Sequence, residues 1–196
     1  MPYQSNVLKC ASCGFPVGVG DAFCPAGHPQ TITSFNSVYD MPMPMLRKYS
    51  NACNKELNFN PENPGLNTSL GMCYLKLKQY DKALNCFERA IEENFDNSEL
   101  CFYAAVALLR GRKAFVASRR DIDRIITLIE DANMIEPRGI YYYFLAYIKY
   151  DYFERRYLDT EPDYNECLDT AFEVGVSRAD VKMLFDVLGV EQPNFE

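Results

Sequence analysis

Residues 63–97, NPGLNTSLGMCYLKLKQYDKALNCFERAIEENFDN, decide the fold of this chain. Their apolar side chains recur every three or four positions, which is the period of an amphipathic helix. We expect one helix over residues 66–77 and a second over residues 80–94, separated by a very short turn near residues 78–79. So short a connection makes the two helices antiparallel neighbours.

The two expected helices carry complementary faces. Small residues at Gly71, Ala83 and Ala90 allow the helix axes to approach closely, and the rings of Tyr74 and Phe87 fill the space beside them. A single helix pair cannot bury all of its apolar surface, so this pattern predicts further helices packed on both sides.

The spacing LG--Y followed by A---F--A resembles a tetratricopeptide repeat. The family's packing positions are occupied by Leu70, Gly71, Tyr74, Ala83, Phe87 and Ala90. Two departures from the family pattern are Asn67, where a large aromatic residue is usual, and the region of Phe95, where the usual closing proline is replaced. The resemblance implies a stack of antiparallel helix pairs.

Later segments resemble the same unit more loosely. Residues 98–111 and 121–137 form a second expected pair, and residues 139–153 and 164–175 form a third, each with a long connection. Residues 45–61 resemble a lone second helix, and residues 177–189 resemble a helix that caps the end of the array, with Ser177 as its N-cap. The alternative is an irregular helical bundle without solenoid geometry.

These patterns divide the chain into three expected parts. Residues 1–34 are rich in Gly, Pro, Ser and Cys and predict a small module of turns and short strands. Residues 35–44 contain two prolines and predict a linker, and residues 45–196 predict a repeat domain. The expected fold is therefore mainly α, a solenoid of antiparallel helix pairs preceded by a small β/turn module.

Composition limits the classes of function. The chain has 196 residues and a formal net charge of −7, which disfavours bulk attraction to nucleic acid or to an anionic membrane. No apolar run reaches the roughly 20 residues that span a bilayer, and MPYQSNVLKC lacks the features of a signal peptide. We expect a cytoplasmic protein whose eight cysteines are reduced, with some of them serving as metal ligands.

Four residues that can serve as metal ligands lie near the N-terminus in the spacing C-x2-C-x10-C-x3-H. They are Cys10, Cys13, Cys24 and His28. Zinc prefers four such donors in a tetrahedron, and two donors separated by two residues can face one ion from a tight turn. The segment resembles a zinc ribbon, in which the metal replaces a hydrophobic core. Many ribbons have Cys at the fourth ligand position, whereas His28 lies one residue further on, so a redox-active or metal-free cysteine cluster stays open as an alternative.

The same cluster argues against catalysis. His28 is the only histidine, and four protein ligands would leave no open position for water at a metal. With that histidine used as a ligand, no His base remains for a Ser or Cys nucleophile. The other cysteines, which lie at expected helix packing positions, are Cys53, Cys73, Cys86, Cys101 and Cys167. We therefore expect a non-catalytic protein with structural zinc.

The family resemblance implies a partner-binding groove lined by the first helix of each pair. Carried onto this chain, the groove residues are Thr68, Met72, Leu75, Phe102, Val106, Leu109, Tyr143 and Tyr147. Such an apolar and aromatic lining suits an apolar or amphipathic peptide. The alternative is a short array that packs these aromatic side chains internally.

Two further surfaces are candidates for binding. Residues 110–124 form a basic segment that would suit an acidic partner or a phosphate backbone, with Arg110, Arg112, Lys113, Arg119 and Arg120 as its cations. The small module offers apolar contacts for docking at Phe15, Val17, Val19 and Phe23.

We therefore expect an intracellular adaptor that binds another protein or peptide through its repeat domain, with the zinc module as a possible second docking surface. The alternative is a nucleic-acid-associated regulator that uses the basic segment, although residues 1–40 offer only one Lys and no Arg to support it. The sequence leaves the oligomeric state open.

Overall fold

The computed structural model describes residues 8–195 and begins with a small hairpin. Strand β1 (Leu8–Lys9) pairs antiparallel with β2 (Pro16–Val17), and Leu8 lies opposite Val17. A second, shorter antiparallel bridge joins Phe23 to Pro29. These two pairings make residues 8–34 a module of turns with little regular structure, as its composition predicts; we call it the small module.

Helices make up most of the remaining chain. They are α1 (Phe35–Tyr39), α2 (Met43–Leu57), α3 (Pro64–Lys76), α4 (Tyr80–Glu93), α5 (Ser98–Leu108), α6 (Arg119–Ile135), α7 (Gly139–Ile148), α8 (Tyr164–Val174) and α9 (Arg178–Leu188). The two long connections hold short elements: the 3-10 helix η1 (Ala114–Val116), and the π-helix η2 (Lys149–Phe153) followed by the 3-10 helix η3 (Glu154–Arg156).

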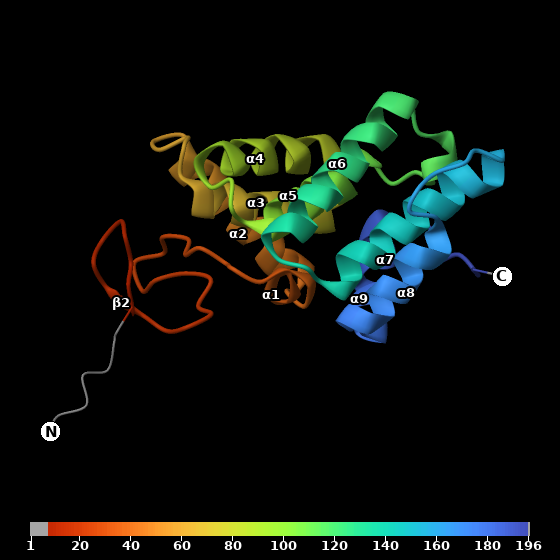
Figure 1. Cartoon of the computed structure of the whole chain (residues 1–196). Coiled ribbons are helices and arrows are strands. Elements are labelled where there is room, and N and C mark those ends of the chain that lie inside the picture. The colour runs from red at the N-terminus through yellow and green to blue at the C-terminus, as the bar shows by residue number, and fades with distance from the viewer. Residues whose placement is uncertain (1–7, 196) are drawn as a thin grey trace, which may run out of the picture.

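The helices stack in sequential antiparallel pairs. Helix α3 packs most closely on α4, α5 on α6, and α7 on α8, while α4 contacts α5 and α6 contacts α7. Figure 1 shows the small module at one end of this array and the C-terminus at the opposite end. The expected mainly α fold with tetratricopeptide-like helix pairs is confirmed.

The first pair shows why this sequence allows such close packing. A β-carbon placed on Gly71 would lie 2.6 Å from Cε1 of Phe87, so only glycine lets the Phe87 ring approach α3. Asn67, which replaces the aromatic residue usual in the family, is buried, and its amide donates hydrogen bonds to the carbonyls of Pro61 and Asn63 at 2.8 and 3.0 Å. Asn67, although unusual at this position of the family pattern, therefore stabilises the start of α3 through these hydrogen bonds.

Polar side chains cap the N-terminal ends of α3, α5, α6, α8 and α9. At each of these helix starts a side-chain oxygen accepts a backbone N–H of the first turn, which would otherwise lack a partner. The residues in this role are Asn63, Asn97, Ser118, Asp163 and Ser177. The N-cap expected at Ser177 is confirmed.

Two expectations about the ends of the array are wrong. Residues 35–44 were expected to be a linker, but they contain α1, whose Phe35 and Val38 side chains are buried in the core of the repeat domain. Helix α9 was expected to cap the end of the stack. It packs on α7 and also lies back along the array, where Tyr39 of α1 donates a hydrogen bond to Asp186 of α9 at 2.6 Å.

Candidate metal centre and inner groove

Two tight turns position the four cysteine and histidine side chains. In the first turn the backbone N–H of Gly14 donates to the carbonyl of Cys10 at 2.8 Å. In the second the N–H of Gly27 donates to the carbonyl of Cys24 at 2.8 Å. Both glycines have positive φ, at 74° and 87°, which a residue with a side chain adopts only at a cost. Each turn thus depends on a glycine that follows its first ligand residue.

The turns bring all four expected metal ligands together. The donor atoms of Cys10, Cys13, Cys24 and His28 lie within 4.8 Å of one another. The sulfurs of Cys13 and Cys24 are 3.6 Å apart, and Nδ1 of His28 is 3.5 Å from the sulfur of Cys24. No pair of these cysteines forms a disulfide. This Cys3His arrangement, the metal cluster, can hold one metal ion.

The surroundings lower the pKa of two thiols of the metal cluster, Cys10 and Cys24, and raise the pKa of Cys13; thiolate is the form that binds metals. Burial raises the pKa of Cys10, but hydrogen bonds from the Gln30 amide and from the backbone N–H groups of Cys13 and Ser12 outweigh it and lower this pKa to about 6. The Gln30 amide lies 3.2 Å from the Cys10 sulfur and also donates to the carbonyl of His28 at 3.0 Å. Gln30 therefore orients two ligand residues from outside the cluster.

The small module is fastened to the helical array. The ring of Phe23 packs edge-on against Tyr49 of α2, with ring centres 5.7 Å apart, and the hydroxyl of Tyr49 donates to the carbonyl of Gln30. The backbone N–H of Ile32 donates to the hydroxyl of Ser69 on α3 at 2.8 Å. Phe23 is half-buried and packs on the helical array, and its role in a second docking surface stays a prediction.

The other apolar residues of the small module remain accessible. Phe15 is 52% exposed and Val19 is 92% exposed, while Val17 is partly buried. Their role as a second docking surface stays a prediction.

Most of the eight expected groove residues are buried in the structure. Thr68 is partly exposed. The other seven side chains are buried: Met72, Leu75, Phe102, Val106, Leu109, Tyr143 and Tyr147. Most of this lining is therefore covered within the array, and the role of these residues in partner binding stays a prediction.

The reason for this burial is that α1 and α9 cover the face on which α3, α5 and α7 lie side by side; we call this the inner face. The ring of Phe185 in α9 packs edge-on against Tyr143 and Tyr147 of α7, with ring centres 6.4 and 5.2 Å apart. Phe35 of α1 packs against Tyr103 of α5 at 5.1 Å. The array thus closes its inner face with two of its own helices.

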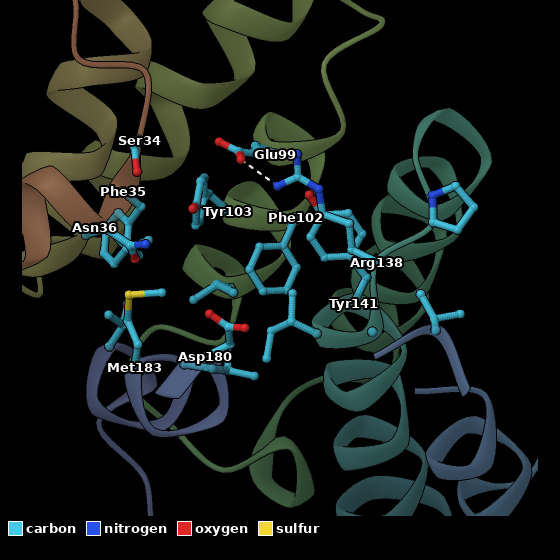
Figure 2. Close-up of a pocket in the computed structure, with 18 of the residues that line it drawn as sticks. Ser34, Phe35, Asn36, Glu99, Phe102, Tyr103, Arg138, Tyr141, Asp180 and Met183 are labelled. Atoms are coloured by element: carbon cyan, nitrogen blue, oxygen red, sulfur yellow. Dashed lines mark hydrogen bonds and ion pairs between the residues drawn. The ribbon is translucent and has the colours of Figure 1, made fainter. Parts of the chain in front are cut away.

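A pocket of about 330 Å³ remains between these covering helices and the inner face. Figure 2 shows residues of α1, α5, α9 and the start of α7 around it, and Leu75 of α3 and Val174 at the end of α8 complete the lining. Its apolar and aromatic lining includes Leu75, Phe102, Val106, Tyr141 and Met183. Three of the expected groove residues, Leu75, Phe102 and Val106, are therefore part of one concave site.

The rim of this pocket is charged. Arg138 donates to Glu99 at 2.6 Å, drawn as a dashed line in Figure 2, and to Glu136 at 2.8 Å. Burial lowers the pKa of Arg138, but these hydrogen bonds outweigh it and raise the pKa overall. Asp180 of α9 adds a further carboxylate to the lining. The site therefore combines aromatic walls with a polar rim.

The basic segment is partly neutralised by its own neighbours. Arg110 pairs with Asp81 at 2.7 Å and Arg119 with Asp123 at 2.7 Å. Arg112, Lys113 and Arg120 form no ion pair within residues 8–195. Binding of an anionic partner here stays a prediction, and the local pairing gives it no added support.

Sequence reasoning missed the residues that hold the two covering helices. These are Tyr39, Tyr80, Asp186 and Gln192, which connect α9 and the segment after it to α1, α4 and α7. The apolar spacing of Val181, Leu184, Phe185 and Leu188 indicates an amphipathic helix. This spacing does not indicate which surface of the array the helix covers.

Comparison with known protein families matches residues 68–97 to the tetratricopeptide repeat, a range that spans most of α3 and all of α4. Among solved structures, seven chains match. One, named MamA MSR-1 C2, superposes with a TM-score of 0.51 at 21% sequence identity, over 66% of this chain and 67% of that chain. A comparison with curated proteins found no match.

These likenesses identify one repeat by sequence and a shared fold for the wider array. Among residues 8–195, no helix is both long and apolar enough to cross a membrane.

Proposed function

We propose that this chain is a non-catalytic adaptor that binds a protein or peptide partner at its inner face. The proposal rests on one observation above the others, the open pocket that α5, α7 and α9 line with aromatic and apolar side chains. Recognition of a peptide needs such a concave apolar site with a few fixed polar groups, and Arg138 and Glu99 supply these at the rim.

The proposal also assigns zinc to the metal cluster. Zinc bound to sulfur at about 2.3 Å and to nitrogen at about 2.0 Å in a tetrahedron separates two sulfurs by about 3.8 Å, and sulfur from nitrogen by about 3.5 Å. The corresponding distances here are 3.6 Å between Cys13 and Cys24 and 3.5 Å between Cys24 and His28. Three thiolates and one imidazole are donors that zinc prefers, and four protein ligands make a closed, structural site.

The adaptor role is tested by affinity capture from the native cell with the full-length chain as bait. Met183 lines the pocket, so Met183→Trp fills part of it with a larger ring. Lys182→Trp is the matched control, because the neighbouring Lys182 side chain is 72% exposed on the outer side of α9.

We expect a protein that is enriched by the wild-type chain and by Lys182→Trp but is lost with Met183→Trp. Enrichment of no protein by the wild-type chain, or equal enrichment by all three baits, would contradict binding at this pocket. The chain has no tryptophan of its own, so fluorescence of the single introduced ring reports whether each variant is folded.

A further inference from the structure

Helix α9 lies on the inner face in the manner of a bound helical ligand. Val181, Leu184, Phe185 and Leu188 follow the spacing i, i+3, i+4, i+7 and are all buried, whereas Lys182 and Asp186 lie on the opposite, exposed side. This is the way in which an amphipathic helix lies in an apolar groove. A helical ligand at this face presupposes the proposed adaptor function and specifies the class of partner.

The surface beneath α9 recognises both the side chains and the end of a helix. Phe185 fills the space beside Tyr143 and Tyr147 of α7. At the C-terminal end of α9, the hydroxyl of Tyr80 lies 2.9 and 3.3 Å from the carbonyl oxygens of Val187 and Leu188. Carbonyl groups in the last turn of a helix lack intrahelical partners, so Tyr80 provides a contact specific to a helix terminus.

Helix α9 fills this surface incompletely. Beside Met183 and Leu184 it leaves the pocket of about 330 Å³ between itself, Phe102 and Tyr141. A helix with a larger side chain at the position of Met183 would therefore make contacts that α9 does not make.

Helix α9 can also leave without breaking the array. It is the last helix, and a short exposed connection containing Gly175 and Ser177 joins it to α8. The three helix pairs from α3 to α8 contact one another directly, through α4 with α5 and α6 with α7, independently of α9. Its departure would uncover the apolar inner face while leaving those contacts in place.

We propose that the inner face binds an amphipathic helix of a partner protein, and that α9 occupies this site until the partner displaces it. The partner helix presents large apolar side chains at the spacing of Val181, Leu184, Phe185 and Leu188, with an aromatic or long aliphatic side chain at the position of Met183. Because α9 is tethered, its effective concentration at the site is on the order of millimolar, and weakening it raises the affinity for an external helix.

The test uses a fluorescein-labelled peptide of residues 177–190 carrying Met183→Trp, titrated against the full-length chain with anisotropy as the readout. Phe185→Ala in the full-length chain weakens the seating of α9 by removing a buried ring. Phe172→Ala is the matched control, because Phe172 on α8 is 64% exposed. We expect Phe185→Ala to bind the peptide at least about tenfold more tightly than the wild-type chain, and Phe172→Ala to bind it as the wild-type chain does.

The proposal would be overturned if all three chains bound the Met183→Trp peptide with equal affinity. It would also be overturned if a peptide that additionally carries Leu184→Asp and Phe185→Asp bound as tightly as the Met183→Trp peptide. Hydrogen exchange on the wild-type chain keeps the test decisive if Phe185→Ala does not fold. We expect the α9 amides to exchange at least about tenfold faster than those of α5, because α9 opens locally. Exchange of α9 at the rate of α5 would mean that the helix leaves only on global unfolding, which contradicts the proposal.

Other outcomes separate this inference from the adaptor role. A dimer mass in light scattering, with α9 exchanged between two copies, would assign the inner face to a second copy and overturn the partner-helix claim. Successful capture at the pocket together with failed peptide binding would overturn the helix inference alone. Failure of the capture experiment would remove the adaptor role, and with it this inference.

Discussion

The small module and the helical array are stabilised by opposite means. In the array, Leu46, Phe87, Leu100 and Phe144 are completely buried, and apolar side chains fill the space between successive helices. In the small module, Cys10 and Cys24 are the buried side chains at the centre, while Phe15 and Val19 are exposed. A segment of this size cannot form an adequate apolar core, and the proposed zinc would supply the missing interior.

The contrast extends to cysteine chemistry. Burial raises the pKa of Cys53 in α2 to about 12 and that of Cys86 in α4 to about 11. Burial acts in the same direction on Cys10, but Gln30 and two backbone N–H groups stabilise its thiolate and lower its pKa to about 6. The same residue type therefore serves as an apolar packing group in the array and as a member of the metal cluster in the small module, where we propose that it binds zinc.

The largest expected effect separates the two regions directly. Cys24→Ser removes a ligand, and because the apparent free energy of zinc binding in small modules is about 10 kcal/mol or more, we expect loss of the metal and of order in residues 8–34. Helical circular dichroism should fall by less than about a tenth, since the array keeps its own core. The matched Cys86→Ser variant should retain zinc, measured by elemental analysis. Unfolding of the helices together with metal loss would show that the two regions do not differ as described.

Removing an aromatic ring from the array is the next largest change. Phe87 is completely buried against Gly71, so Phe87→Ala should lower the free energy of unfolding by about 3 to 5 kcal/mol. Phe95→Ala removes a ring that is 79% exposed and should change it by less than about 0.5 kcal/mol. Urea denaturation measures both. A similar cost for the two variants would contradict close packing of the first helix pair.

Thiol accessibility gives a third comparison. After chelation of the metal, the three cysteines of the metal cluster should react with a thiol reagent under native conditions. The five helix cysteines are buried, and their reaction requires opening of the array, so they should react at least about a hundredfold more slowly. Denaturation should release all eight thiols. Rapid reaction of more than three thiols in the folded, chelated chain would argue against a stable array.

The smallest expected effect concerns the attachment of α9. The ion pair with Lys182 and the hydrogen bond from Tyr39 lower the pKa of Asp186 below its usual value. A lowered carboxyl pKa contributes stability above the unfolded-state pKa near 4, and this stability is lost as the pH falls through the lower folded-state value. Because Asp186 is 45% exposed, Asp186→Asn should cost less than about 1 kcal/mol at pH 7. Thermal unfolding should show this difference shrink as the pH falls below about 4; a difference that stays constant through this range would contradict the assignment.

The sequence predicts local structure here far better than distant contacts. The positions of Gly71 and Phe87 predict a close helix pair, because both lie within one repeat and follow a fixed period. The spacing of Cys10, Cys13, Cys24 and His28 likewise predicts the metal cluster, since tight turns restrict the geometry of neighbouring ligands.

The occupied inner face could not be predicted in this way. It depends on contacts such as that between Tyr39 and Asp186, which are 147 residues apart. Amphipathic spacing shows that α9 must cover an apolar surface, but the surface is chosen by the packing of the completed array. The family resemblance was misleading at this point, because it implied an open groove where this chain places α1 and α9.

The most direct test of the metal-held module is X-ray absorption at the zinc edge on the purified full-length chain, handled without chelators. We expect one zinc per chain, with three sulfur ligands near 2.3 Å and one nitrogen ligand near 2.0 Å. Such a shell would establish His28 as the fourth ligand beside Cys10, Cys13 and Cys24. Less than about half an equivalent of zinc after metal-replete purification, or a shell without three sulfurs, would contradict the account.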